Sequence, residues 1–154
     1  MYVGEGGSMT SNETAAQNIF KVLLVYFKDQ SINKMVQFKI KRVYEDYAEA
    51  DGYRVLVDKL WPRGMKKEAL KYDYWAKDIT PSTALRRWCH EDIPGHWNEF
   101  TIRYQEELAD SSHVADFLDL IKPYPVVTLL YASKEPVHNH ARILRDYLEI
   151  HLKE

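Results

Sequence analysis

Apolar and polar residues recur with two different periods along this chain, and the two periods predict strands and helices. Every second residue is apolar in residues 36–41, which is typical of a strand with one buried face. Residues 53–57 and 126–131 are mostly apolar runs of strand length, and the second is apolar enough to be buried on both faces of a sheet. Residues 45–52 predict an acidic loop that ends in an Asp-Gly turn, and residues 73–77 predict a further short strand.

The helical period of 3.6 follows in four other segments. The first predicted helix begins after Ser82, which is a suitable N-cap, and the next two cover residues 94–108 and 112–121. A last helix follows Pro136. Strands that alternate with helices favour an α/β fold, and we expect a single three-layer domain with a mostly parallel central sheet covered by helices.

The N-terminal part of the chain does not share this organisation. We therefore divide the chain into an N-terminal extension, residues 1–34, and an α/β domain, residues 35–154, which is of ordinary single-domain size. Residues 19–27 are apolar except for Lys21, but they are too few for a membrane span, which needs about 20 residues. They could form an extra strand, form a short helix packed on the core, or precede a natural start at Met35.

Composition excludes several classes of protein. With 45% hydrophobic and 29% charged residues the chain is globular rather than disordered, and its net charge of −2 gives no overall attraction to nucleic acid or to an anionic membrane. Residues 34–87 nevertheless hold 13 Lys or Arg against 8 Asp or Glu, which indicates either a local anion-binding surface or an ordinary solvated face. The single cysteine, Cys89, cannot form an internal disulfide, so we expect a cytosolic protein.

Charged residues gather where two of the predicted strands end. Residues 55–64 (VLVDKLWPRG) begin as a buried strand and then stop at a proline and a glycine. Residues 131–140 (YASKEPVHNH) leave another strand in the same way and enter a helix. Since ligands of open α/β sheets bind beyond the carboxyl ends of strands, both segments would line one crevice if the two strands are parallel neighbours. The free amides of the last helix would then add positive charge to that of Arg63 and Lys134.

The chain resembles a known family at these segments and at several others. The resemblance rests on residues 41–44 (KRVY), 51–64 (DGYRVLVDKLWPRG), 79–83 (ITPST), 85–86 (LR), 129–134 (LLYASK) and 139–141 (NHA). They are similar in residue type and order to the YeaO-like family, domain of unknown function 488. The resemblance runs from about residue 36 to residue 152 and implies a small bacterial or archaeal cytosolic α/β protein. It implies no reaction, and it does not extend to residues 1–34, to the loop at 89–95 or to His138.

Each charged candidate has a functional and a structural interpretation. Arg63 could hold a carboxylate or phosphate in two contacts, or it could pair with Asp58 or Asp78. Asp58 could act as a general base if burial raises its pKa, or it could orient Arg63 or cap a turn. Lys77 and Asp78 could join the same crevice or form an exposed pair. Of two neighbouring arginines that point about 100° apart on a helix, the resemblance favours Arg86.

The aromatic residue and the histidines carry similar alternatives. Trp61 could stack on a flat ligand or belong to the core. Cys89 and His90 do not form a thiolate pair, because adjacent helical residues point apart, and Cys89 is expected to be buried. His138 and His140 stand two residues apart and would diverge on a helix, which argues against a metal site. His140 is better placed to move a proton or to cap the last helix.

Two functions remain at this predicted crevice. The first is a binding or regulatory module for a small anionic or nucleotide-like ligand, and the alternative is an enzyme of the hydrolase or transferase type acting on such a molecule. No phosphate loop, dinucleotide motif, zinc module or other cofactor motif is present, and we expect neither cofactor nor membrane partner. The net charge does not favour nucleic acid as a partner, and the sequence carries no signal for an oligomeric state. The candidate catalytic residues are Asp58 and His140, and the candidate ligand-binding residues are Lys59, Trp61, Arg63, Lys77, Asp78, Ser82, Arg86, Tyr131, Lys134 and Asn139.

Overall fold

The computed structural model describes residues 14–25 and 36–153, and the chain divides into two units after Met35. In the first unit, residues 14–25 form one helix whose side chains are exposed. The possibility of an extra strand at residues 19–27 is therefore wrong for residues 19–25, and the other two residues lie outside the described part. Within the described residues, no helix is both long and apolar enough to cross a membrane.

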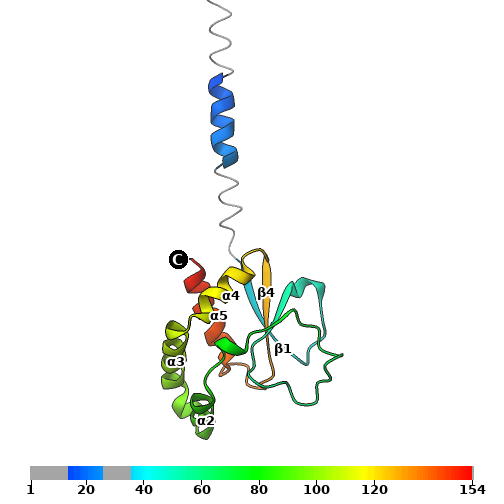
Figure 1. Cartoon of the computed structure of the whole chain (residues 1–154), viewed down its shortest axis with the longest axis vertical. Helices are drawn as coiled ribbons and strands as arrows, with labels where there is room; N and C mark the ends of the chain where they lie inside the picture. Colours follow the sequence, from blue (N-terminus) through cyan, green and yellow to red (C-terminus); the bar gives the residue numbers. More distant parts are fainter. Residues whose placement is uncertain (1–13, 26–35, 154) are drawn as a thin grey trace, which may run out of the picture. The chain divides into compact units, whose positions relative to one another are not determined.

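A parallel sheet organises the second unit. Its strands are β1 (Gln37–Arg42), β2 (Tyr53–Leu56), β3 (Tyr74–Trp75) and β4 (Val126–Tyr131), and they lie side by side in the order β1-β4-β2-β3 (Figure 1). Every pairing in the sheet is parallel. The predicted α/β fold with a parallel central sheet is confirmed. β2 and β4 are parallel neighbours, which is the condition under which the two strand exits would line one crevice.

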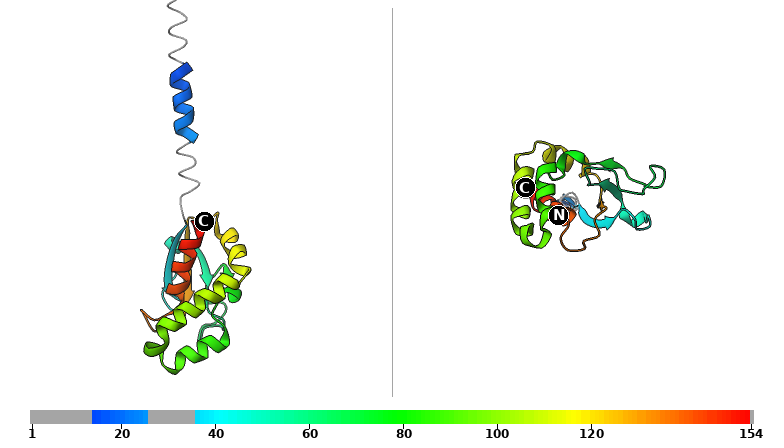
Figure 2. Two further views of the ribbon diagram at one scale, coloured as in Figure 1. Left: turned by 90° about the vertical axis from the view of Figure 1, so that its left-hand side faces the viewer. Right: turned by 90° about the horizontal axis from the view of Figure 1, so that it is seen from below.

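The helices α2 (Thr83–Glu91), α3 (Ile93–Asp110), α4 (His113–Ile121) and α5 (His140–Leu152) lie on one side of the sheet (Figures 1 and 2). Their buried residues form one apolar core with alternate residues of the strands, such as Leu129 of β4. The helical period buries these residues because it places one stripe of each helix toward the sheet.

The opposite face of the sheet has a different cover. The short 3₁₀ helix η1 (Glu49–Asp51) and the irregular segment 57–73 lie there instead of long helices, and a smaller cluster that includes Leu56, Leu70 and Leu130 fills this side. Leu129 and Leu130 of β4 thus belong to different clusters, as the period of two along a strand requires. The sheet is buried on both faces, which explains the continuous apolar run of β4.

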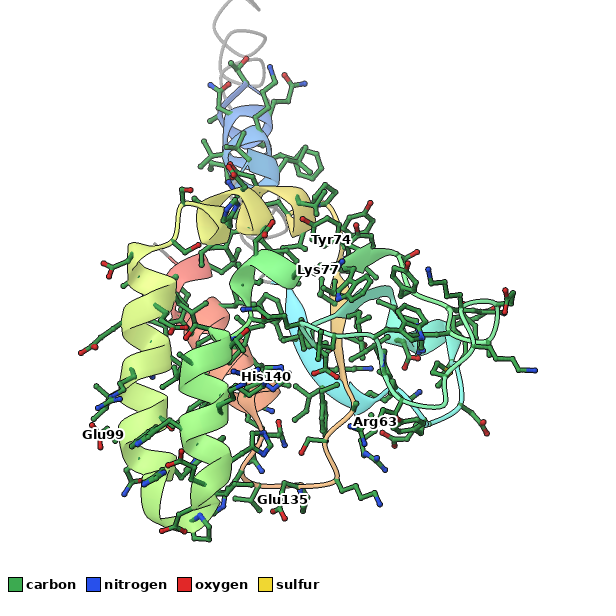
Figure 3. The ribbon with its side chains drawn as sticks, turned by 60° about the horizontal axis from the view of Figure 1, so that its bottom comes forward. Arg63, Tyr74, Lys77, Glu99, Glu135 and His140 are labelled. Carbon is green, nitrogen blue, oxygen red and sulfur yellow. The ribbon has the colours of Figure 1, made fainter. Side chains whose placement is uncertain are left out.

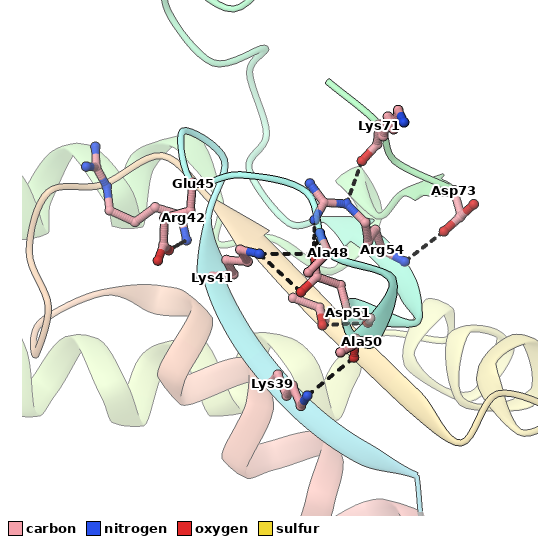
Figure 4. Close-up of polar contacts among 11 residues, drawn as sticks. Lys39, Lys41, Arg42, Glu45, Ala48, Ala50, Asp51, Arg54, Lys71 and Asp73 are labelled. Atoms are coloured by element: carbon pink, nitrogen blue, oxygen red, sulfur yellow. Dashed lines mark hydrogen bonds and ion pairs between the residues drawn. The ribbon is translucent and has the colours of Figure 1, made fainter. Parts of the chain in front are cut away.

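A cluster of ion pairs formed by Lys41, Asp51 and Arg54 holds η1 against the sheet (Figure 4). The carboxylate of Asp51 pairs with the guanidinium of Arg54, lies 3.1 Å from the ammonium of Lys41 and accepts a hydrogen bond from the amide of Ala48. Burial acts to raise the pKa of Asp51, but the Ala48 amide and the two cations outweigh it and hold this pKa below its usual value. Gly52 then turns the chain into β2 with a φ of 64°, close to the Val126 carbonyl. The predicted acidic loop thus contains a cluster of ion pairs centred on Asp51, and it ends in the expected glycine turn.

Helix caps set the boundaries that position the site. Ser82 caps α2, as predicted, with its hydroxyl oxygen 3.2 Å from the amide of Leu85. The last helix begins at His140 rather than directly after Pro136, because Asn139 is its N-cap. The Asn139 side chain accepts a hydrogen bond from the amide of Arg142 and donates one to the Glu135 carbonyl. These two bonds leave residues 132–139 as a fixed loop between β4 and α5.

Candidate functional site

A cavity of about 520 Å³ opens beyond the carboxyl ends of the strands. Its walls come from the segment that follows β2, from the loop between β4 and α5, and from α2 and α3. The volume falls in the range of roughly 300–1,000 Å³ that is common for small-molecule sites. Parallel pairing produces this arrangement, because it brings the carboxyl ends of β2 and β4 to the same edge of the sheet.

Hydrogen bonds join the two strand exits at the floor of the cavity. The Asp58 carboxylate accepts a bond of 2.8 Å from the amide of Ala132, which follows β4. The Nε2 atom of His140 lies 2.7 Å from the carbonyl oxygen of Val57, which precedes Asp58. The first bond joins residues that are 74 positions apart in the chain and the second joins residues that are 83 apart. The two bonds thus hold the segment after β2 against the loop and helix after β4.

Asp58 and His140 form a half-buried pair in this floor. The distance between Asp58 Oδ1 and His140 Nε2 is 3.3 Å. Burial raises the pKa of Asp58 above its usual value, although His140, the Ala132 amide and the charge of Arg86 act in the opposite direction. Because a carbonyl only accepts hydrogen bonds, the contact with Val57 requires a proton on His140 Nε2. A neutral His140 would therefore offer Nδ1, and not Nε2, as its proton acceptor.

The backbone around Arg63 is held by three contacts. The turn that carries it is closed by a hydrogen bond of 3.3 Å from the Met65 amide to the Pro62 carbonyl, with Gly64 at a φ of 73°. The indole of Trp61 donates to the Met65 carbonyl, and the hydroxyl of Tyr44 donates to the Arg63 carbonyl over 2.8 Å. The Arg63 side chain itself is exposed. Arg63 thus has an exposed side chain on a turn whose backbone is held by hydrogen bonds.

Four cationic side chains line the cavity: Lys59, Arg63, Arg86 and Lys134. Within the described residues, none of them forms an ion pair with a carboxylate. The structural alternative for Arg63, a pair with Asp58 or Asp78, is wrong, since Asp58 contacts His140 and Asp78 lies 4.0 Å from His113 Nδ1. The cavity thus combines four cations outside ion pairs with the single carboxylate of its lining, that of Asp58.

Trp61 fits both of its interpretations. Its ring makes edge contacts with Trp75 and Tyr72, with centroids 5.5 and 5.7 Å apart, so it belongs to the smaller apolar cluster. It is only partly buried, however, and it also lines the cavity. A tryptophan whose indole N–H is already bonded can offer its apolar edge or face to a ligand but no further donor.

Four predicted residues lie elsewhere. Lys77 extends over the Trp75 ring at 3.8 Å, and together with Asp78 and Ser82 it lines a second hollow beside α4. Tyr131 is buried in the main core with 7% of its surface exposed. Asn139 does line the cavity, but both ends of its amide are used to cap α5. These residues thus lie near the carboxyl edge of the sheet, but the position of a residue after a strand does not fix the direction of its side chain.

The cavity is also lined by residues that the sequence pattern did not predict as site residues. Trp97 and Phe100 of α3 form one wall, and His138 lies against Trp97. Helical spacing had placed both aromatic residues on the inner side of α3, but spacing does not distinguish the core from a cavity wall. Cys89 is buried as expected, and burial raises the pKa of its thiol, which disfavours a thiolate there. No group of three or more potential metal ligands occurs in the part of the chain that the structure describes.

Comparison with known proteins places the same segment in a wider group. Residues 37–154 match a family model described as the inactive DUF488-N3 subclade. The chain is 44% identical over 114 residues to the uncharacterized protein YeaO of Escherichia coli K12, which covers 73% of this chain and 97% of that protein. It is 42% identical over 110 residues to an uncharacterized protein of Mycobacterium tuberculosis H37Rv, which covers 71% and 92% respectively. No solved structure matches.

Proposed function

This chain belongs to the YeaO-like family of DUF488 proteins, and from that premise we propose that it is a binding or regulatory module whose cavity holds a small anionic, nucleotide-like molecule. The observation that carries the proposal is the set of four cations, Lys59, Arg63, Arg86 and Lys134, that line one cavity and, among the residues that the structure describes, form no ion pair with a carboxylate. Cations outside ion pairs are available to a phosphate or carboxylate, and arginine suits such groups because its fork makes two parallel hydrogen bonds.

The apolar part of the cavity supports a ligand larger than a free anion. Leu60, Pro62, Ile93 and Trp97 line the same space as the cations. Small-molecule sites commonly combine mostly apolar walls with a few charged groups that orient the ligand. A nucleotide has this combination in one molecule, since it joins a flat ring to a phosphate.

The floor of the cavity favours binding over turnover. The carboxylate of Asp58 is held by the Ala132 amide, and His140 Nε2 is held by the Val57 carbonyl, so both groups already contribute to the fold. The family description as an inactive subclade points in the same direction. A cytosolic location goes with this proposal, because the single Cys89 is a free thiol and a reducing compartment keeps it so.

An enzymatic function remains the second candidate because of the Asp58–His140 pair. A half-buried carboxylate of raised pKa within 3.3 Å of a histidine is suited to proton transfer. As an enzyme of the hydrolase or transferase type, the protein would use the cations to hold an anionic substrate over this pair. Conversion of a bound nucleotide to product, lost in Asp58→Asn with binding retained, would favour this candidate.

A thermal unfolding screen tests the proposed function. Nucleotides, sugar phosphates and short oligonucleotides are added separately, and a ligand at a hundred times its dissociation constant stabilises the folded state by about 2.7 kcal/mol. Arg63→Ala and Arg86→Ala should remove the stabilisation. The matched control is Arg87→Ala, because Arg87 is the exposed neighbour of Arg86 and does not line the cavity. A ligand that stabilises both cavity variants as much as the unmodified chain would show that the binding site lies elsewhere.

A further inference from the structure

The cavity has two chemically different sides. Three of the four cations, Lys59, Arg63 and Lys134, come from the two strand exits, where Leu60 and Pro62 also line the cavity, and the fourth, Arg86, comes from α2. The side formed by α3 is apolar and aromatic, since Ile93, Trp97 and Phe100 line it. Figure 3 shows the labelled His140 between the pair of helices α2 and α3 and the labelled Arg63. His140, which contacts Asp58, lines the same cavity as both sets of residues.

Three rings form a continuous aromatic wall on the α3 side. The centroids of Trp97 and Phe100 lie 5.2 Å apart with an interplanar angle of 28°. The centroid of His138 lies 5.0 Å from that of Trp97, at an angle of 34°. All three rings line the cavity, Phe100 as a buried residue and Trp97 and His138 as partly buried ones. Trp97 and His138, the two outer rings, are thus the more accessible part of the wall.

Hydrogen bonds hold the two segments that carry the outer rings of the wall, the start of α3 and the loop before α5. Trp97 stands in the first half of α3, whose start is capped by the Asp92 carboxylate on the Gly95 amide. His138 stands in the loop that Asn139 fixes, and the Arg142 guanidinium donates a hydrogen bond of 3.0 Å to the Pro136 carbonyl in the same loop. A flat ligand that stacks on such a wall meets rings that are already ordered, so little further entropy is lost.

We infer that Trp97 and His138 form the recognition site for the ring of the ligand, and that the cations at the strand exits take its phosphates. This inference rests on the proposed function and deepens it, since it names a nucleotide with its base on α3 and its phosphates at Arg63 and Lys134. Base stacking on aromatic side chains tolerates different bases, because every base has a π-face. The wall therefore selects for the presence of a base, and the cations select for phosphate.

Isothermal titration with two probes, ADP and inorganic pyrophosphate, tests the inference because the second probe has phosphates but no base. Trp97→Leu should weaken ADP binding by about fivefold or more while changing pyrophosphate binding by less than about twofold. Arg63→Ala should weaken both. Trp88→Leu is the matched control, since Trp88 is a partly buried tryptophan on α2 that stacks on His96 and does not line the cavity.

A second substitution covers the case in which Trp97→Leu does not fold. His138→Ala removes the other outer ring from a surface loop and should also weaken ADP more than pyrophosphate. Equal weakening of the two probes, or no weakening of either, would overturn the inference and leave the proposed function in place. Absence of ADP binding by the unmodified chain, with pyrophosphate bound, would also overturn it. Absence of binding by both probes would count against the proposed function itself.

Discussion

Replacing Asp58 with asparagine removes the one carboxylate among the described residues that line the cavity, and we expect it to tighten the binding of an anionic ligand. The side chain is about as large as the original and is mostly buried, with 17% of it exposed, so the cavity keeps its shape. At a separation of about 8 Å and an effective dielectric constant between roughly 20 and 80, one unit charge repels another by about 0.5–2 kcal/mol. This corresponds to an affinity gain of about two- to thirtyfold for a ligand with one negative charge near the cations.

Titration calorimetry with ADP measures this gain directly. Glu106→Gln is the matched control, because it makes the same change in net charge at an exposed position of α3 that does not line the cavity. The gain should also shrink as salt is added, since screening weakens the repulsion. Weaker ADP binding by Asp58→Asn, in a variant that is still folded at the temperature of the titration, would refute the reasoning, because it would mean that the carboxylate contacts the ligand favourably.

Further predictions concern the stability of the fold that carries the site. Asp51→Asn should lower the free energy of unfolding by about 3–5 kcal/mol in urea titrations, because it leaves the buried Arg54 without its carboxylate; a loss below about 1 kcal/mol would contradict this. Gly52 and Gly64 both have a positive φ, which costs a residue with a side chain about 1–2 kcal/mol. Of the two, only Gly52 would also have a Cβ 2.4 Å from the Val126 carbonyl oxygen, so Gly52→Ala should destabilise the chain more than Gly64→Ala. Equal losses in the two variants would show that close approach has no effect there. Burial raises the pKa of Asp58, so its ionisation lowers the free energy of unfolding at pH values above the folded-state pKa. The unmodified chain should regain this stability as the pH falls through that pKa toward the usual value near 3.8, whereas Asp58→Asn has no such group to protonate. The free energy of unfolding of Asp58→Asn minus that of the unmodified chain should therefore decrease over this range, and an increase would contradict the raised pKa.

The sequence pattern was a good guide to the sheet and to most of the helices. The mostly apolar run at residues 126–131 coincides with β4, because this strand is buried on both faces and its one polar residue, Thr128, is buried with its hydroxyl bonded to the Asp51 carbonyl. The last helix was less well placed. Its start depends on the side chain of Asn139, which bonds to both the helix and the preceding loop, and hydrophobic spacing contains no such information. Nor did any pattern indicate that the irregular segment 57–73 would cover one face of the sheet.

The site was only partly accessible from the sequence. Strand exits identify residues by their place in the chain, and this was enough to bring Asp58, Arg63 and Lys134 to one cavity. The direction of a side chain after a strand depends on the local backbone, and η2 (Lys77–Ile79) turns Lys77 onto the Trp75 ring. The aromatic wall was missed because Trp97 comes from a helix between the two strand exits, and its spacing matches that of an ordinary core residue.

The most direct test of the central claim is to map the binding of ADP on the unmodified chain by the chemical shifts of its backbone amides. If the cavity at the carboxyl edge of the sheet is the site, shift changes at saturation should be concentrated in residues 58–64 and 132–140 and in the first half of α3. Changes concentrated instead around Asp78 and His113, which line the second hollow, would contradict the claim. So would an unchanged spectrum at millimolar ADP.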